Sequence, residues 1–173
     1  MDKLTAQQRH VNMQHIKSKD TTIEIIIRKA LWQKGYRYRK NFKLLPGTPD
    51  IAITKYKIAI FCDSEFFHGY QWETKKLRLG TNRNYWIEKI ERNISRDQRN
   101  DKALLAAGWI PIHFWGKDIL SHEKDCIKAI DDLILELKVQ SFVDEPEDLT
   151  LFDNTEKTDS LNLECWRNLY GKT

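Results

Sequence analysis

Apolar and polar residues along the first third of the chain follow helical and strand periods in turn. Residues 21–34 place apolar side chains at helical spacing after a capping position and stop at Gly35, which predicts a helix. Residues 36–43 alternate, and two apolar runs at 50–53 and 57–63 are bounded by turn residues, so three strands are expected. The last run is apolar enough to lie in the centre of a sheet.

The rest of the chain predicts a loop, two helices and one more strand. Residues 64–82 form an irregular, aromatic-rich loop, and residues 84–107 have the length and pattern of a long helix. Residues 109–114 are expected to form a strand near a sheet edge, because they contain a proline. Residues 121–139 predict a closing amphipathic helix. This order of elements is typical of a single α/β domain with a mixed central sheet flanked by helices.

Charge is distributed unevenly between the expected parts of the chain. We expect an N-terminal arm at 1–18, a domain at 19–140 and an acidic tail at 141–173. Of the 29 basic and 25 acidic residues, three basic and eight acidic ones lie in residues 144–173, which gives that segment a net charge of −5 and the remainder +9. A basic body indicates a polyanionic partner such as nucleic acid, although a basic solvated surface gives the same pattern. The tail is interpreted as a solvated extension, with shielding of the basic face as the alternative.

The cysteines and apolar segments exclude several classes of protein. Cys62, Cys126 and Cys165 are far apart and odd in number, which argues against a disulfide framework and a cysteine-rich zinc site. The first residues lack the apolar core of a signal peptide, and no stretch is long and uncharged enough to span a bilayer. We therefore expect a cytoplasmic protein without a membrane partner.

Acidic residues mark the ends of the two central strands. Asp50 follows a turn, Asp63 ends the next run, and Glu65 would share a face with Asp63 if that strand continued. Antiparallel pairing would bring Asp50 and Asp63 to one end of the sheet, where converging carboxylates favour a divalent cation such as Mg²⁺. The alternative is that Asp50 is a turn residue and Asp63 a strand-end cap.

The aromatic loop adds candidate DNA contacts and a candidate base. Phe66 and Phe67 cannot both face the core of one strand, so at least one is exposed or packs beneath the loop. An exposed aromatic pair beside carboxylates suits insertion between bases, whereas a small local core is the alternative. His68 is near enough to act as a general base. The remaining histidines are interpreted as ordinary surface or structural residues: His10, His15, His113 and His122.

Five segments, taken in order and spacing, resemble the very-short-patch-repair (Vsr) endonucleases: 18–24, 45–50, 61–69, 85–97 and 105–109. The resemblance covers roughly residues 9–120 and implies a fold of the type II restriction-endonuclease kind. It also implies Mg²⁺-dependent cleavage of one DNA strand, 5′ to the thymine of a T·G mismatch that arises when 5-methylcytosine deaminates.

The resemblance assigns roles to individual residues. Asp50 and the backbone carbonyl of Cys62 are expected to bind the metal, and Glu24 to orient metal-bound water. His68 is expected to be the catalytic histidine, and Asp97 to orient it. The residues expected to contact DNA are Phe66, Phe67 and His68 as a wedge, Met13 and Ile16 as a second wedge from the arm, and Lys89 and Asn93 as further contacts.

The chain departs from the better-known Vsr pattern at two places. The Cys and His residues of a structural zinc site are replaced by Glu65, Tyr70, Trp72 or their neighbours, and by Gly116. We therefore expect no structural zinc, and a loop held by the packing of Tyr70 and Trp72. A histidine that usually precedes the wedge is replaced by Asp63, which is expected to be catalytic, with Asp63 or Glu65 as the second metal ligand.

The expected partner is double-stranded DNA with a T·G mismatch, cut by a monomer that is functionally paired with a cytosine-5 DNA methyltransferase. Three alternatives remain. The first is a restriction-type or nicking endonuclease of the same fold that acts on matched DNA. The others are a non-catalytic DNA-binding module and an interaction protein whose acidic tail is the contact.

Overall fold

The computed structural model describes residues 5, 7, 8, 11, 19–80 and 82–143. Met13 and Ile16, the two residues expected to insert into DNA from the arm, lie outside the described residues, and so does the acidic segment from residue 144. Within the described part, no helix combines the length and the apolar character needed to cross a membrane.

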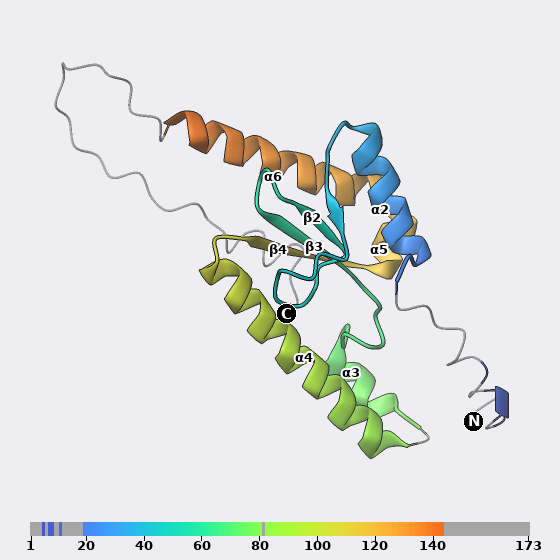
Figure 1. The fold of residues 1–173 in the computed structure, drawn as a ribbon. Coiled ribbons are helices and arrows are strands. Elements are labelled where there is room, and N and C mark those ends of the chain that lie inside the picture. The colour runs from blue at the N-terminus through green and yellow to red at the C-terminus, as the bar shows by residue number, and fades with distance from the viewer. Residues whose placement is uncertain (1–4, 6, 9–10, 12–18, 81, 144–173) are drawn as a thin grey trace, which may run out of the picture.

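Four strands form one mixed sheet in the order β1-β2-β3-β4 (Figure 1). The first three strands pair antiparallel, and β3 and β4 pair parallel. The mixed sheet is confirmed, as is the edge position of the strand that contains Pro111. The expected strand at 36–43 is much shorter in the structure. The strands are β1 Arg39–Lys40, β2 Ile51–Ile53, β3 Ile58–Asp63 and β4 Ile110–Trp115.

The helices agree with the sequence pattern except around residues 64–82 and 116–121. The expected irregular loop contains a short α-helix and a 3-10 turn, and an additional helix lies between β4 and the closing helix. The helices are α2 Thr22–Gln33, α3 Trp72–Lys75, η1 Lys76–Arg78, α4 Arg83–Ala106, α5 Gly116–Ser121 and α6 Glu123–Val143.

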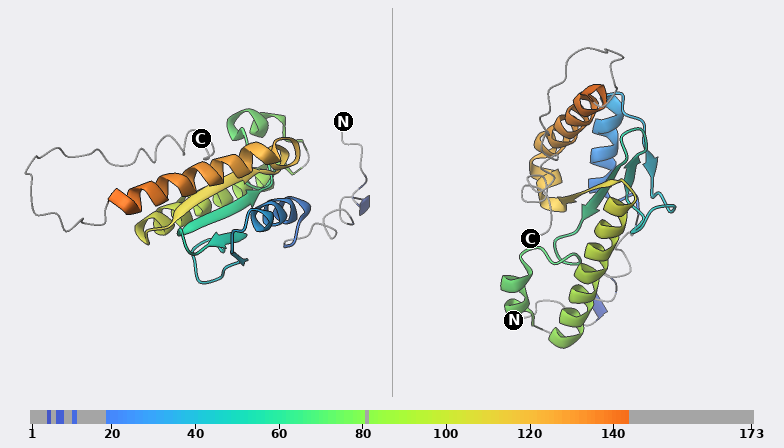
Figure 2. Two further views of the ribbon diagram at one scale, coloured as in Figure 1. Left: turned by 90° about the horizontal axis from the view of Figure 1, so that it is seen from above. Right: turned by 90° about the vertical axis from the view of Figure 1, so that its left-hand side faces the viewer.

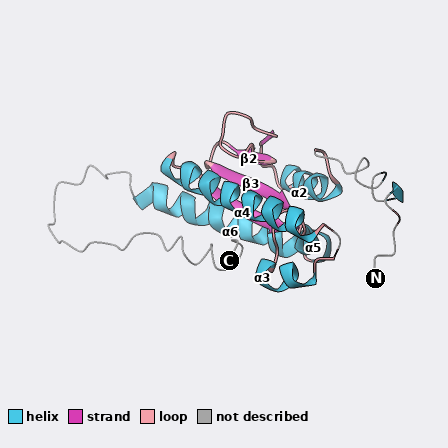
Figure 3. Ribbon diagram, turned by 90° about the horizontal axis from the view of Figure 1, so that it is seen from below, coloured by secondary structure: helices cyan, strands magenta, loops and turns pink. Residues whose placement is uncertain are grey.

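The sheet lies between two layers of helices. Helices α2, α5 and α6 cover one face, and the long α4 covers the other (Figures 1 and 2). From below, α4 crosses in front of β3 (Figure 3). The two faces of the sheet therefore have different neighbours, and alternate residues of a strand face one side or the other.

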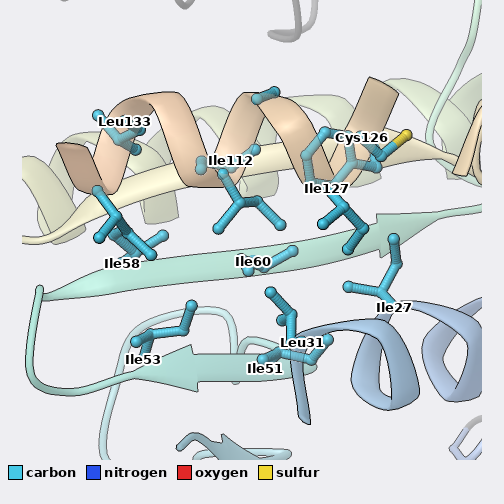
Figure 4. Close-up of a cluster of buried hydrophobic side chains, with 14 of the residues drawn as sticks. Ile27, Leu31, Ile51, Ile53, Ile58, Ile60, Ile112, Cys126, Ile127 and Leu133 are labelled. Atoms are coloured by element: carbon cyan, nitrogen blue, oxygen red, sulfur yellow. The ribbon is translucent and has the colours of Figure 1, made fainter. Parts of the chain in front are cut away.

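The core lies on the face towards α2 and α6. Ile58 and Ile60 of β3 and Ile112 of β4 pack there against Ile27 and Leu31 of α2 and against α6 (Figure 4). Burial of each such side chain contributes about 1.5–3 kcal/mol, so this face supplies much of the stability of the domain.

Strand side chains alternate, so the intervening residues point towards α4. They are Phe61 and Asp63 of β3 and His113 of β4, and the last two contact aspartates of α4 directly or through His68. Asp63 and His113 thus lie on the face opposite the apolar core.

Candidate active site

The first turn of α2 is tied to the start of β2 through Glu24 and Arg28. Glu24 is 3% exposed, and its Oε1 accepts hydrogen bonds from the backbone N and the hydroxyl of Thr21, the N-cap residue. Its Oε2 lies 2.6 Å from Arg28 Nη2, which also donates to the backbone oxygen of Asp50 at 3.3 Å. A buried carboxylate and its counter-charge are therefore held beside the candidate metal ligand.

Asp50 is a mostly buried carboxylate whose charge is incompletely balanced. Its Oδ2 accepts a hydrogen bond from the backbone N of Cys62 at 2.8 Å. Burial is the largest influence on the pKa of Asp50, which rises to about 6. The charges of Glu24 and Asp63 also raise this pKa, whereas the hydrogen bond from the amide of Cys62 and the charge of Arg28 lower it. Neighbouring positive charge would relieve this repulsion.

Cys62 offers no reactive thiol to the site. Its side chain packs against the core, and burial raises the pKa of the thiol well above its usual value. Among the residues that the structure describes, no three His, Cys, Asp or Glu side chains are grouped as a metal site. The donor set of Asp50 and a backbone carbonyl fits Mg²⁺ in particular, because that ion keeps several waters and takes one or two carboxylates plus substrate phosphate.

His68 lies between two carboxylates. Its Nδ1 is 2.9 Å from Asp97 Oδ2 on α4 and 3.2 Å from Asp63 Oδ1 at the end of β3. The next residue, Gly69, has φ +73°, and a Cβ there would come within 2.5 Å of Ile94 on α4. The absence of a side chain at Gly69 lets the loop approach α4 closely enough for His68 to reach Asp97.

Asp63 also meets a second histidine. Its Oδ2 lies 2.7 Å from Nδ1 of His113, and Nε2 of that ring lies 2.9 Å from Asp101 Oδ1. Burial lowers the pKa of His113, but the hydrogen bonds to Asp101 and Asp63 outweigh it and raise the pKa to about 9. Both oxygens of Asp63 therefore face imidazole nitrogens.

Glu65 lies beyond the end of the strand, so the condition under which it would share a face with Asp63 is not met. Strand β3 ends at Asp63, and the chain turns through residues 64–70. The carboxylate of Glu65 instead accepts a hydrogen bond from the backbone N of Lys117 in the first turn of α5, at 2.5 Å.

Tyr70 and Trp72 make side-chain contacts that hold the loop. Tyr70 packs edge-on against Trp115 at 5.0 Å between ring centroids, and its hydroxyl accepts a hydrogen bond from Nζ of Lys117. Trp72 Nε1 donates to Glu91 on α4 at 3.3 Å. These contacts fix the loop between the end of β4 and α4.

The two phenylalanines belong to a larger aromatic cluster on the surface. Phe66 and Phe67 pack edge-on at 5.2 Å, and Trp86 of α4 lies 4.9 Å from Phe66 and 6.3 Å from Phe67. Tyr85 extends the cluster at 5.2 Å from Trp86, and Lys89 lies 5.4 Å from both rings. Phe66 remains 42% exposed and Tyr85 55% exposed, so the cluster is partly open to a ligand.

Asn93 is placed differently from Lys89. Its Nδ2 donates to the backbone oxygen of Phe67 at 3.0 Å, so the side chain supports the aromatic loop from α4. Lys89 is half-buried, and its Nζ donates to the hydroxyl of Tyr85 at 3.2 Å.

Sequence reasoning missed Trp86, Asp101 and His113. Asp101 follows Asp97 by four residues on a predicted helix, so both lie on the same helix face. That spacing was a usable signal, whereas the pairing of His113 with Asp63 depends on the parallel register of β3 and β4.

Comparison with known proteins supplies independent information. The sequence model of the family described as DNA mismatch endonuclease Vsr matches residues 1–74. The type II nicking enzyme V.HpaIIP of Haemophilus parainfluenzae is 43% identical over 137 residues, covering 79% of this chain and 97% of the relative.

Two further relatives extend the similarity. The type II nicking enzyme V.NmeDIP of Neisseria meningitidis serogroup C is 41% identical over 157 residues, covering 91% of this chain and 100% of the relative. The DNA mismatch endonuclease Vsr of Escherichia coli strain K12 is 31% identical over 128 residues, covering 74% of this chain and 81% of the relative. The similarity thus spans the described domain rather than one motif.

The raised pKa of Asp50 makes stability depend on pH in the absence of metal. The unfolded chain has an Asp pKa of 3.8 and the folded protein about 6, so stability is greatest below the lower value and falls as the pH rises through the higher one. Asp50→Asn removes this ionisation and keeps an acceptor for the amide of Cys62. In EDTA the variant should melt several degrees above the wild type at pH 7.5 and close to it at pH 4, with about 3 kcal/mol as the upper limit.

Thermal unfolding by circular dichroism at the two pH values measures this difference. The Asp132→Asn variant, at an exposed aspartate of α6, serves as the control and should follow the wild type. An Asp50→Asn protein that melts at or below the wild-type temperature at pH 7.5 would contradict the interpretation.

Proposed function

We propose, from the premise that the chain belongs to the Vsr family of DNA mismatch endonucleases, that it nicks one strand of a duplex 5′ to the thymine of a T·G mismatch. Mg²⁺ is the proposed cofactor. The single observation that carries the proposal is the placement of His68, held at Nδ1 by two aspartates, at the same end of the sheet as Asp50.

His68 is oriented for proton transfer by one particular nitrogen. Because carboxylates accept hydrogen bonds, Nδ1 carries the proton that points to Asp97 and Asp63. Nε2 of the neutral ring is then the acceptor that can take a proton from an attacking water. Loss of that proton makes water a stronger nucleophile towards a phosphodiester.

Asp50 and the carbonyl of Cys62 would hold the metal. When bound, Mg²⁺ supplies positive charge to the scissile phosphate and makes a bound water more acidic. Glu24 is close enough to Asp50 to raise its pKa, and its proposed role is to orient water through this shared polar environment. Asp63 and Glu65 have other hydrogen-bond partners, so we assign them to the orientation of His68 and the N-terminus of α5 in place of the expected metal ligation.

The aromatic cluster supports a preference for mismatched DNA. Insertion of Phe66, backed by Phe67 and Trp86, would unstack neighbouring bases, and a mismatched step costs less to unstack than a matched one. Lys89 beside these rings suits contact with the phosphate backbone. The alternative, a restriction-type enzyme acting on matched DNA, would not need such a wedge.

Several finer assignments belong to the same proposal. The enzyme is proposed to act as a monomer, because only one strand is cut, and to be paired functionally with a cytosine-5 DNA methyltransferase. Residues 1–18 are proposed as a DNA-contacting arm, with Met13 and Ile16 as inserting residues. Residues 141–173 are proposed as an acidic extension, of which residues 141–143 form the end of α6.

Strand-specific nicking tests the proposal directly. Duplexes carrying T·G or C·G, end-labelled on each strand and placed in several methylation-site contexts, are incubated with the protein and either Mg²⁺ or EDTA. The expected result is a nick only 5′ to the mismatched thymine and only with Mg²⁺. Asp50→Ala should lower the rate at least about 10³-fold, because the metal site is lost.

The control variant is Asp132→Ala, which removes an exposed aspartate of α6 and should nick like the wild type. Equal cleavage of T·G and C·G duplexes would instead favour the restriction-type alternative. An absence of cleavage in every context, with binding retained, would favour the non-catalytic module.

The proposed insertion of Phe66 can be tested separately from the metal site. Phe66→Ala should raise KM for the T·G duplex roughly 10-fold with a small change in kcat, since stacking of an aromatic side chain on a base contributes about 1–3 kcal/mol. Steady-state nicking measures both constants. Phe142→Ala removes another exposed phenylalanine, on α6, and should leave both constants unchanged; a Phe66→Ala enzyme with the same kinetics would exclude insertion.

A further inference from the structure

His113 is a buried histidine for which the proposed reaction has no assigned use. It lies in β4 with 6% exposure, and both ring nitrogens meet carboxylates, Nδ1 with Asp63 at 2.7 Å and Nε2 with Asp101 at 2.9 Å. Because both partners are acceptors, the ring donates at both nitrogens. One imidazole therefore connects β3, β4 and α4.

The plane of this ring is fixed from its side. Phe61 is the residue opposite His113 in the parallel β3–β4 pair, and its ring stacks on the imidazole at 4.7 Å and 9° between planes. A ring held by two hydrogen bonds and one stacked neighbour has little freedom to rotate. The orientation of His113 consequently fixes the direction in which Nδ1 donates.

The hydrogen bonds form a continuous chain to the proposed base. It runs from Asp101 through His113 and Asp63 to His68, and ends at Asp97, one helical turn from Asp101 on α4. Asp63 is the link in the middle, since Oδ2 faces His113 and Oδ1 faces His68. A change in the direction of the Asp63 carboxylate would alter the second acceptor of His68.

We propose that His113, which Asp101 also holds, is a positioning residue that sets the Asp63 carboxylate so that Asp63 and Asp97 together fix the imidazole of His68. The inference rests on the proposed function, because His68 matters only if it transfers a proton. Buried charged groups contribute little net stability compared with well-packed apolar residues of similar volume, so stability alone is a weak reason for this chain of residues.

Two amide variants of His113 separate its hydrogen bond to Asp63 from its hydrogen bond to Asp101. In His113→Asn the amide nitrogen takes the position of Nδ1 and can still donate to Asp63, whereas in His113→Gln it takes the position of Nε2 and reaches Asp101. Single-turnover nicking of the T·G duplex should fall on the order of 10-fold in His113→Gln and less than about threefold in His113→Asn, since small displacements of catalytic groups have large effects on rate. KM should stay within about twofold in both.

The comparison is made between variants whose melting temperatures agree, and His122→Gln, at an exposed histidine, is the surface control. Equal rates in the Asn and Gln variants, or a loss that follows melting temperature, would overturn the proposal. The double variant of His113→Gln with Asp63→Asn gives a further test. His113→Gln should cause no further loss of nicking rate when Asp63→Asn is already present, whereas an additive loss of rate would overturn the proposal.

A spectroscopic readout distinguishes failure of this inference from failure of the proposed function. Long-range ¹H–¹⁵N spectra report which ring nitrogen of His68 carries the proton. The Nδ1–H form should dominate in the wild type and in His113→Asn, and His113→Gln should show a mixture. An unchanged His68 spectrum in His113→Gln would overturn the inference even if the enzyme nicks as proposed, and a wild type that never nicks would overturn the function whatever the spectra show.

Discussion

Three carboxylates converge at one end of the sheet, and the way in which each negative charge is balanced separates their roles. Glu24 faces the guanidinium of Arg28, and Asp63 lies between two imidazoles. Asp50 has the amide of Cys62 as its close donor, and its pKa is raised to about 6. Asp50, whose pKa burial raises, is the carboxylate proposed to bind a divalent cation, and DNA phosphate would share the charge of that cation.

The two faces of the sheet allow this polar site to exist beside a continuous apolar core. Even-numbered residues of β3 and β4, such as Ile60 and Ile112, pack against α2 and α6, whereas Asp63 and His113 point towards α4. The buried residues of α4 are Ile90, Asp97 and Leu104, and Asp97 meets the imidazole of His68 there.

The sequence predicted the parts of this arrangement that depend on local pattern. The helix before β1, the two central strands and the long α4 follow from periodicity. The resemblance assigns Asp50, His68 and Asp97 to one site. It did not reveal the partners of Asp63, because they depend on the parallel register of β3 with β4, a contact between segments about fifty residues apart. The surroundings of Glu65 stayed open for a related reason, since nothing local shows that β3 ends two residues before it.

The effect of Mg²⁺ on thermal stability tests most directly whether Asp50 binds a divalent cation. Melting temperatures of the wild type and of Asp50→Asn are measured at pH 7.5 in EDTA and in millimolar Mg²⁺, without DNA. Binding to the folded state should raise the melting temperature of the wild type by a few degrees and that of Asp50→Asn by less than about one degree. Equal shifts in the two proteins, or none in either, would contradict the account.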